Sequence, residues 1–473
     1  MSVQRQRTPI AEYDAIVVGA GLAGLSAAAT LAEYGSRTLV IEKTSTIGGT
    51  TAMSGGWFAF SETDEQDALG ITDSDTVYVQ DMYDAADRCA DLRLLTALAR
   101  DQHEAYDWLK GHRVTFDVVK ISSGQTVPRS HHARIDRVLA ALRASIEQSG
   151  LVDLETNCRL VDLVVDSDGS VVGVQVNGPD GDRSDTARGG VLLASGGFTR
   201  SPELIGRFVP EQTQAMPYGG LGNTGDGFLI AHRLGAGYRD TEFLSGTYGS
   251  HPDTGIEEHE LLTAFYMGAI IVNTRGERFV DESLSYKTLG AACLRQPDGL
   301  AFQVFDRDVR AKSQPGVPLS DIGHLEDKGH VFRADSLTEL ASISGIDVGG
   351  LQASVEEYNR IVAGTAEDPF SRNGLCNGVG ALQPIDEPPF YAYPAKTLMT
   401  STYCGVTVTP TAEVTDRSGV PIPGLYAAGE IVGGYHGKAY VTGTALTKSL
   451  VCGRVAAREM IRRAHRIPGS EAS

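Results

Sequence analysis

The sequence predicts an α/β fold in which two distant segments build one domain and a smaller α+β cap domain is inserted between them. Three observations lead to this prediction. An apolar strand runs into a glycine-rich turn near residue 20, a second apolar strand ends in Ala-Gly-Glu near residue 430, and dinucleotide-binding patterns are missing between about 240 and 383. The expected limits are 1–240 and 384–473 for the two segments and 241–383 for the cap.

The first glycine-rich turn has the spacing of a dinucleotide site. The apolar residues 16–18 lead into Gly19, Gly21 and Gly24, and a helix is expected over 22–34. In this arrangement backbone N–H groups and a helix N-terminus face a pyrophosphate. The segment therefore predicts a Rossmann-like nucleotide-binding unit.

Two acidic residues extend this interpretation. Glu42 ends the apolar run 38–41, where a carboxylate can reach the ribose hydroxyls of an adenosine half. Much later, residues 423–430 look like the second flavin-contacting strand of proteins with a two-segment (GR2-type) dinucleotide fold, in which the late acid Glu430 meets the ribityl chain. Together they favour FAD over NAD, and the domain is predicted to be a Rossmann-like FAD-binding domain.

Other small-residue segments fit the same cofactor. Residues 47–57 are so rich in glycine and small side chains that the backbone is expected to lie against a flat, bulky group such as an isoalloxazine ring. In the turn 224–227, Asp226 could cap the following helix or lie near the cofactor, and we favour the second role. A helix beginning at 443–444 would present its N-terminus to negative charge.

Composition excludes several classes. With 41% apolar and 21% charged residues the chain of 473 residues can bury a large core, and a net charge of −19 repels nucleic acids and anionic lipids. Six cysteines without a Cys-x-x-Cys pair, and histidines without a third ligand at a recognisable spacing, predict no bound metal and no disulfide framework. Because no apolar stretch has the length of a membrane span, we expect a cytoplasmic protein without one.

Periodicity predicts the remaining elements. Apolar residues at helical spacing favour helices within 75–112 and over 133–150. Turn residues between short apolar runs predict hairpins over 160–176 and over 270–279. One helix is expected in the cap, over 351–363.

Residues 14–464 resemble the fumarate reductase and succinate dehydrogenase flavoprotein superfamily. The segments that carry the resemblance are 17–24, 48–56, 194–198, 224–227, 276–282 and 421–454. The cofactor contacts expected from the motifs and the resemblance are Gly19, Gly21, Gly24, Glu42, Lys43, Gly49, Thr50, Thr51, Ser54, Gly55, Gly56, Ala194, Gly196, Asp226, Glu430, Thr444, Ala445 and Leu446. Respiratory members attach their flavin through a histidine at the place that Gly49 and Thr50 fill here, so we expect non-covalent FAD.

The chain departs from the dicarboxylate-reducing members at two positions. Those members have arginines where this sequence has Tyr286 and Tyr440. Without two bidentate cations the site cannot grip a dianion such as fumarate. The two tyrosines instead resemble those of the 3-ketosteroid Δ1-dehydrogenase branch, in which one phenol abstracts a proton beside a ketone and the other hydrogen-bonds the ketone oxygen.

The chemistry of ketone desaturation agrees with that resemblance. It needs a donor at the oxygen, a base at the α-carbon and a hydride acceptor at the β-carbon, which Tyr440, Tyr286 and flavin N5 can supply. Because a phenol is a weak base, we expect a cation, a second tyrosine or a helix terminus near Tyr286. Tyr403 and Gly443 are expected to contact substrate, and Arg129 is either a flavin-side or substrate-side element or a surface ion pair.

The leading hypothesis is an FAD-dependent dehydrogenase that introduces an α,β double bond next to a ketone of a cyclic substrate, either a 3-ketosteroid or a smaller cyclohexanone-type ring. Its electrons would pass to an unidentified acceptor other than NAD. The alternative is a flavin-dependent ene-reductase acting on an activated alkene, with Tyr286 as proton donor. A flavin-carrying redox sensor or assembly subunit is the third possibility.

Overall fold

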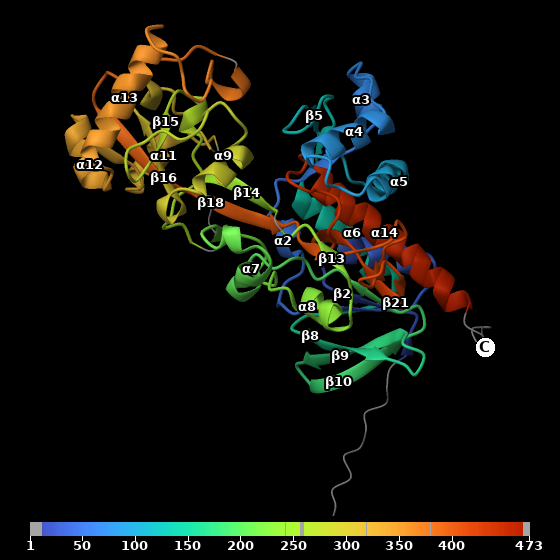
Figure 1. Cartoon of the computed structure of the whole chain (residues 1–473). Helices are drawn as coiled ribbons and strands as arrows, with labels where there is room; N and C mark the ends of the chain where they lie inside the picture. Colours follow the sequence, from blue (N-terminus) through green and yellow to red (C-terminus); the bar gives the residue numbers. More distant parts are fainter. Residues whose placement is uncertain (1–11, 242, 256–259, 318, 379, 467–473) are drawn as a thin grey trace, which may run out of the picture. The chain divides into compact units, whose positions relative to one another are not determined.

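A computed structural model of the chain describes residues 12–466 except 242, 256–259, 318 and 379. The described residues divide into two compact units (Figure 1). The first unit runs up to Val209 and continues with Gly219–Leu244 and the chain from Ser401 onward; the second unit comprises Pro210–Tyr218 and Ser245–Thr400.

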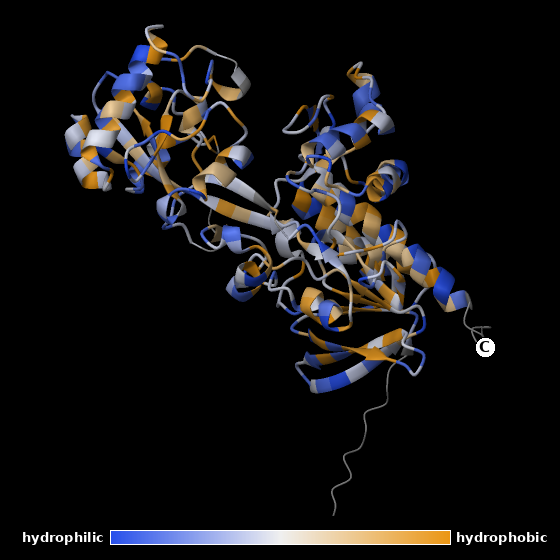
Figure 2. Ribbon diagram, in the orientation of Figure 1, coloured by the Kyte–Doolittle hydropathy of each residue, from blue (hydrophilic) through white to orange (hydrophobic). Residues whose placement is uncertain are grey.

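A six-stranded sheet forms the centre of the first unit. Its order is β20 (Glu413–Thr415), β21 (Pro421–Ala427), β11 (Val191–Leu193), β2 (Ala15–Val18), β3 (Thr38–Ile41) and β7 (Val152–Glu155). All neighbours are parallel except β20, which pairs antiparallel with β21. The inner strands are buried along their whole length and hydrophobic in Figure 2, as expected for parallel strands that are covered on both faces.

Helices cover one face of this sheet and a second sheet covers the other. α1 (Leu22–Glu33) packs between α6 (Ile135–Ser149) and α14 (Thr444–Arg466), and its residues up to Ala32 are all buried. On the opposite face lies the sheet of β1 (Glu12–Tyr13), β10 (Gly181–Ala187), β9 (Val171–Gly178) and β8 (Arg159–Val165), in which β1 runs parallel to β10 and the other neighbours are antiparallel. The predicted α/β class with a Rossmann-like parallel sheet is confirmed.

The other elements of the first unit lie along the connections of this core. A three-stranded sheet joins β4 (Trp57–Ala59), β6 (Ser130–His132) and β5 (Val118–Lys120). The helical stretch expected within 75–112 is two helices, α4 (Asp75–Ala85) and α5 (Leu92–Gly111), because Asp87 and Arg88 adopt positive φ between them. Shorter elements are α2 (Gly49–Ala52), α3 (Asp64–Ala68), α7 (Pro202–Phe208), α8 (Asp226–Arg233) and the pair β13 (Tyr238–Arg239) and β19 (Gly405–Val406).

The second unit is built on a mixed sheet. Its order is β12 (Met216–Pro217), β18 (Phe390–Thr402), β16 (Leu300–Phe305) and β15 (Ile270–Asn273), and β14 (Leu244–Ser250) and β17 (Phe332–Ala334) also pair with β18. The last residues of β18 belong to the first unit.

Alternate residues of these strands enter two hydrophobic cores, one on each face. Ile271 and Tyr393 face a core with α9 (Tyr286–Cys293), α10 (Arg307–Arg310) and α11 (Ile322–Asp327). Ile270 and Val304 face a core with α12 (Leu337–Ser344) and α13 (Val348–Val362). Because both faces are covered, β15 is buried along its whole length.

The hairpin expected over 270–279 is wrong. β15 ends at Asn273 and pairs antiparallel with β16, which lies 27 residues further along the chain. The turn at 274–276 returns the backbone only far enough for one isolated bridge between Val272 and Arg278. Turn chemistry identified the reversal, but the strand partner is set by tertiary packing.

A buried ion cluster holds the second unit together. Glu282 and Arg372 have fully buried side chains, and the Glu282 carboxylate accepts hydrogen bonds from Arg372, Arg278 and the Ile271 N–H. Both guanidiniums also lie over the Tyr358 ring, at 5.3 and 5.6 Å from its centroid. Removing one partner would leave uncompensated buried charge.

Arg372→Met should therefore destabilise the second unit by about 3–5 kcal/mol, the cost of breaking a buried pair from one side. Calorimetric unfolding of the full chain would measure it. Arg333→Met at an exposed position of β17 is the control and should stay within about 0.5 kcal/mol of the native chain. Equal stability of the two variants would contradict the assigned role of the cluster.

Candidate active site

The motif residues of the first unit follow strands that end at one edge of the parallel sheet. Gly19 follows β2, Glu42 follows β3, Ala194 follows β11 and Ala428 follows β21. Carboxyl ends of parallel strands lie at the same edge, which is where nucleotides bind in open α/β sheets. The Gly19 N–H donates to the Ile41 carbonyl at 2.8 Å and fixes the first turn at this edge.

Close backbone contacts explain the glycines of the first turn. Gly19 has a φ of +105°, and a Cβ there would overlap the Ala194 carbonyl. A Cβ on Gly24 would overlap the Gly19 carbonyl. The Gly48 N–H donates to the Ala20 carbonyl at 2.8 Å, so the turn also holds the small-residue run.

The start of α1 has the form of a pyrophosphate site. Gly21 is its N-cap and has no side chain to cap the helix, and the first helical N–H, that of Leu22, donates to Thr51 Oγ1 at 3.2 Å. A Cβ on Gly21 would meet the Gly48 carbonyl and Thr51 Oγ1 only at 3.7 Å, and a Cβ on Gly49 would meet nothing within 4 Å. Open backbone at a helix N-terminus is the geometry that binds phosphate, so these residues fit the pyrophosphate of FAD.

Glu42 is buried at the end of β3. Its carboxylate accepts from the Ala20 N–H at 3.0 Å and from the Thr44 N–H and hydroxyl at 2.9 and 2.8 Å. The carboxylate is thereby oriented toward the glycine turn, beside the expected position of the adenosine ribose.

Lys43 and Asp226 pair with each other. Lys43 Nζ lies 3.1 Å from Asp226, and Arg159 also contacts that carboxylate, at 3.0 Å. Burial favours the neutral form of Asp226, but these two cations outweigh it and hold the pKa of the carboxyl below its usual range. The N-cap of α8 is Gly225, at a φ of +79°, so the capping role weighed for Asp226 is wrong.

Glu430 connects the C-terminal part of the first unit to the glycine turn before α8. Its carboxylate accepts from the Thr402 N–H at 3.0 Å and from Asn223 Nδ2 at 2.8 Å, and Asn223 also donates to Thr50 Oγ1. Burial raises the pKa of Glu430. Sequence reasoning missed Asn223; its place inside the glycine turn before α8 was the only signal.

The N-terminus of α14 rests on β4. The Thr447 hydroxyl donates to the Ala59 carbonyl at 2.9 Å and accepts from the Ala59 N–H at 2.9 Å. Gly443, at a φ of +95°, lies so close to β4 that a Cβ would overlap its backbone. The Thr444 hydroxyl donates to the Val441 carbonyl at 2.7 Å, which fixes the first turn of the helix.

Tyr440 lies in an aromatic cluster with Tyr403 and His436. The ring centroids of His436 and Tyr440 are 5.7 Å apart, those of Tyr403 and His436 5.1 Å, and those of Tyr403 and Tyr440 6.4 Å. Tyr403 and His436 are buried and Tyr440 is half-buried. His436 was not predicted as a site residue, because its contact with two tyrosines depends on the fold.

Tyr286 is the first residue of α9 in the second unit. The N-cap Ser285 accepts a hydrogen bond from the Lys287 N–H. Burial raises the pKa of Tyr286 and lowers the pKa of Lys287 to about 7. Of the three groups expected near Tyr286, the structure provides a helix N-terminus, where a phenolate is favoured electrostatically, and a second tyrosine, Tyr266, whose hydroxyl accepts the Tyr286 N–H at 3.1 Å.

The structure places all but one of the predicted site residues in the first unit. These are Gly19, Gly21, Gly24, Glu42, Lys43, Gly49, Thr50, Thr51, Ser54, Gly55, Gly56, Ala194, Gly196, Asp226, Tyr403, Glu430, Tyr440, Gly443, Thr444, Ala445 and Leu446. Tyr286 belongs to the second unit.

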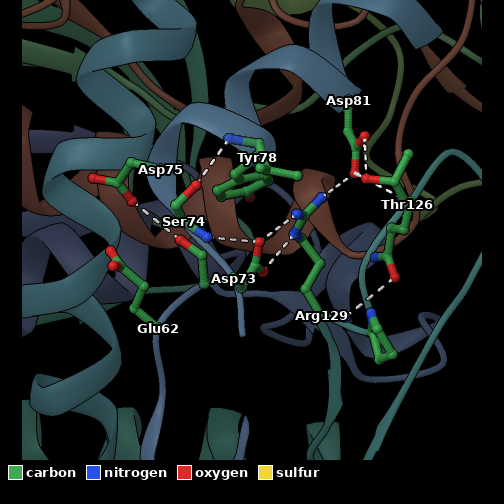
Figure 3. A network of polar contacts seen from close by, with 12 residues as sticks. Glu62, Asp73, Ser74, Asp75, Tyr78, Asp81, Thr126 and Arg129 are labelled. Carbon is green, nitrogen blue, oxygen red and sulfur yellow. Dashed lines mark hydrogen bonds and ion pairs between the residues drawn. The ribbon is translucent and has the colours of Figure 1, made fainter. Parts of the chain in front are cut away.

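Arg129 forms a buried ion cluster of the first unit (Figure 3), so the ion pair considered for it is not on the surface. Its guanidinium donates twice to Asp73, at 2.7 and 3.0 Å, and also contacts Asp81. It lies 5.1 Å from the centroid of the Tyr78 ring, whose hydroxyl donates to the Ala59 carbonyl at 3.0 Å. The cluster therefore supports β4, on which α14 begins.

Gln125 connects the same region to the segment after Tyr440. Its side-chain amide donates to the Thr442 carbonyl at 2.9 Å, and the Arg129 N–H donates to its oxygen. The Ser123 carbonyl accepts from the Thr442 N–H at 3.0 Å. The turn between Tyr440 and α14 is thus held by protein contacts on one side.

Among the described residues, Glu62, Asp75 and His103 form a group whose ligand atoms lie within 4.8 Å of one another, a spacing that could hold a metal ion. Glu62 is exposed, and His103 contacts Asp75 at 2.9 Å. Exposed acidic groups are common without a metal, so the group carries no assignment.

Comparison with known proteins identifies the family. Residues 14–446 match the family described as FAD binding domain, and the chain belongs to it. A probable fumarate reductase of Shewanella frigidimarina is 30% identical over 450 residues, which cover 93% of this chain and 73% of that protein.

Solved structures agree with the sequence comparison. The 3-ketosteroid Δ4-(5α)-dehydrogenase of Rhodococcus jostii matches with a TM-score of 0.78 and 26% identity, covering 97% of this chain and 98% of that one. The 3-ketosteroid Δ1-dehydrogenase of Sterolibacterium denitrificans has a TM-score of 0.83 over 95% and 99% of the chains, and at 22% identity it shows the shared fold.

The predicted superfamily, with its ketosteroid dehydrogenase-like branch, is confirmed, and so is FAD as the cofactor. The protein is an FAD-dependent oxidoreductase that acts on carbon–carbon single or double bonds. None of the helices in the described ranges combines the length and apolar character that a membrane crossing needs.

Gly197→Ala should weaken FAD binding, because its Cβ would overlap Thr402 Oγ1 and the Glu430 carboxylate. Displacing that carboxylate should raise the Kd of FAD about 10- to 100-fold, as expected for 1–3 kcal/mol of overpacking. Titration of the apo-protein with FAD, followed by flavin fluorescence, would measure the change. Gly206→Ala in α7 is the matched control, since a Cβ there meets nothing within 4 Å; an equal Kd for both variants would argue against the role of Glu430.

Proposed function

We propose that this enzyme introduces a double bond α,β to a ketone of a cyclic substrate, with Tyr286 as the base and Tyr440 as the donor to the ketone oxygen. The observation that supports the proposal most is the aromatic cluster of Tyr403, His436 and Tyr440. Tyr440 is half-buried against the buried rings of Tyr403 and His436, and these apolar, hydrogen-bonding surroundings suit a carbonyl-bearing ring better than a dicarboxylate.

The residues divide the chemistry between them. When bound, FAD would accept the hydride that leaves the β-carbon. The Tyr440 hydroxyl would donate to the ketone oxygen, which makes the neighbouring C–H more acidic. Tyr286, as the phenolate, would take the α-proton, and the N-terminus of α9 would stabilise the negative charge of the phenolate before that transfer. One proton and one hydride leave the substrate, so two electrons pass onward to an acceptor that the chain does not identify.

The proposed substrate class rests on the comparison with solved structures. Similarity to the 3-ketosteroid Δ4-(5α)-dehydrogenase of Rhodococcus jostii supports a 3-ketosteroid, and a monocyclic ketone such as a cyclohexanone would present the same carbonyl and α-carbon. We further propose that FAD is held without a covalent bond, because Gly49 and Thr50 offer no nucleophilic nitrogen where the respiratory relatives carry a histidine.

The second candidate is reduction of an activated alkene. Burial raises the pKa of Tyr286, which keeps the phenol protonated and suits a proton donor. A probable fumarate reductase among the relatives also favours this direction. The two candidates use the same side chains with opposite proton transfer.

Tyr286→Phe should lower the rate of ketone-dependent flavin reduction about 10²- to 10⁴-fold, the usual contribution of a positioned acid or base. The phenyl ring keeps the packing of α9, so FAD content should not change. Anaerobic stopped-flow mixing with a panel of 3-ketosteroids and cyclohexanones would measure bleaching of the flavin. Tyr34→Phe at an exposed position is the control; retention of full activity in Tyr286→Phe would remove the proposed base.

The pH dependence separates the two directions. Since burial raises the pKa of Tyr286 above about 10, its phenolate fraction grows with pH throughout the neutral and alkaline range. Desaturation should therefore become faster from about pH 7 to about pH 10, whereas alkene reduction by dithionite-reduced enzyme should change little over the same range, because the phenol stays mostly protonated below its pKa. A flat desaturation profile that persists in Tyr286→Phe would count against the base.

A further inference from the structure

Tyr266 contacts both peptide groups that flank the N-cap of α9. It ends a short 3-10 helix, Ala264–Tyr266, in the second unit. Its hydroxyl donates to the Leu284 carbonyl at 2.9 Å and accepts the Tyr286 N–H at 3.1 Å. One side chain therefore closes the loop through which the chain enters α9.

These two bonds add to an existing cap. Ser285 already accepts from the Lys287 N–H, as an ordinary N-cap does. The Tyr286 N–H is another of the donors at a helix start that have no partner within the helix. Tyr266 satisfies this donor, and it does so at the residue whose phenol we assign to the chemistry.

Tyr266 is itself held in place by the core of the second unit. Its ring lies 4.5 Å from that of Phe265 at an interplanar angle of 65°. The Phe265 carbonyl accepts from Arg372 Nη2 at 3.1 Å, and Arg372 is fully buried against Glu282. The buried ion cluster thus fixes the backbone next to Tyr266.

The same cluster fixes the chain on the other side of the loop. Glu282, four residues before Tyr286, has a fully buried carboxylate bonded to two arginines and to the Ile271 N–H. The segment from Glu282 to Tyr286 is therefore held at its start by ions and at its end by the Tyr266 hydroxyl. Such a segment has little freedom to shift the first turn of α9.

We propose that Tyr266 is a positioning residue that fixes Tyr286 for proton transfer, an inference that rests on the proposed function. A phenol suits this task because one oxygen both donates and accepts, so the carbonyl and the N–H are bound by the same rigid side chain. Burial raises the pKa of Tyr266, which keeps the hydroxyl protonated and able to donate. A displacement of about 1 Å in a reacting group is enough to cost about 10²-fold in rate.

Tyr266→Phe tests this directly, because it keeps the ring packing and removes both hydrogen bonds. With FAD-loaded full-length enzyme and the 3-ketosteroid and cyclohexanone probes, the rate constant of flavin reduction at saturation should fall about 10- to 100-fold while KM stays within about twofold. FAD content should be unchanged, and the melting temperature should stay within about 4 °C.

Tyr358→Phe is the matched control. Among the described residues its buried hydroxyl has no hydrogen-bond partner, so the same chemical change in the same unit should leave both kinetic constants as they are. An equal loss of rate in Tyr358→Phe would overturn the proposal, because it would show a general sensitivity of the unit.

Comparison with Tyr286→Phe distinguishes failure of the positioning role of Tyr266 from failure of the proposed function. If Tyr266→Phe bleaches like the native enzyme while Tyr286→Phe is inactive, Tyr266 has no positioning role and the proposed function stands. If Tyr286→Phe remains active, the proposed base fails, and the positioning role fails with it. A KM that rises with kcat unchanged in Tyr266→Phe would assign the residue to binding and would also refute positioning.

Discussion

Backbone-to-backbone contact at the edge of the parallel sheet is the constraint on which the cofactor site depends. The turn after β2 lies directly against the end of β11, and only glycine at position 19 permits this distance. The same constraint recurs where Gly443 lies on β4. With no side chains between these segments, peptide N–H groups and a helix N-terminus are presented to a bound nucleotide. We propose that two buried carboxylates then add selectivity, Glu42 toward the ribose of the adenosine half and Glu430 toward the second half.

Buried charges serve the scaffold in both units, and phenols serve the proposed chemistry. Arg129 is neutralised by Asp73 and Asp81, and Arg372 by Glu282. Each set supports the backbone close to one proposed catalytic tyrosine: the first through β4 and Gln125, the second through Phe265 and the loop before α9. Relatives that bind dicarboxylates need cations free to meet their substrate. Here the two buried arginines Arg129 and Arg372 are engaged by carboxylates.

Local signals in the sequence were sufficient for much of the fold. The glycine spacing predicted α1, and the Asp-Ser-Asp-Gly turn predicted the β8–β9 hairpin. Helices α6 and α13 were predicted to within a few residues, and α14 was predicted to begin at 443–444. The hairpin at 270–279 failed because β15 takes its partner from a later segment. Helices α9, α11 and α12 were missed because each has eight residues or fewer, too short for a helical period to be recognised.

The site shows the same division between local and tertiary information. The motif glycines could be selected from their spacing, and Tyr286 and Tyr440 could be selected from the family resemblance. The burial of Arg129 could not, because Asp73 and Asp81 precede it by about 50 residues and no pattern links them. Asn223, His436 and Tyr266 acquire their contacts only when distant segments fold together, and single-sequence reasoning has no access to such pairs.

The location of Trp57 at the start of β4, and of Trp108 in α5, has a practical result. These are the two indoles of the chain, and both belong to the first unit. Tryptophan fluorescence, excited at the long-wavelength edge of the absorption band, will therefore report the unfolding of the first unit. It gives no signal for the unfolding of the second unit. A single smooth transition recorded in this way is therefore no proof of cooperative unfolding, and the inserted segment needs its own optical reporter.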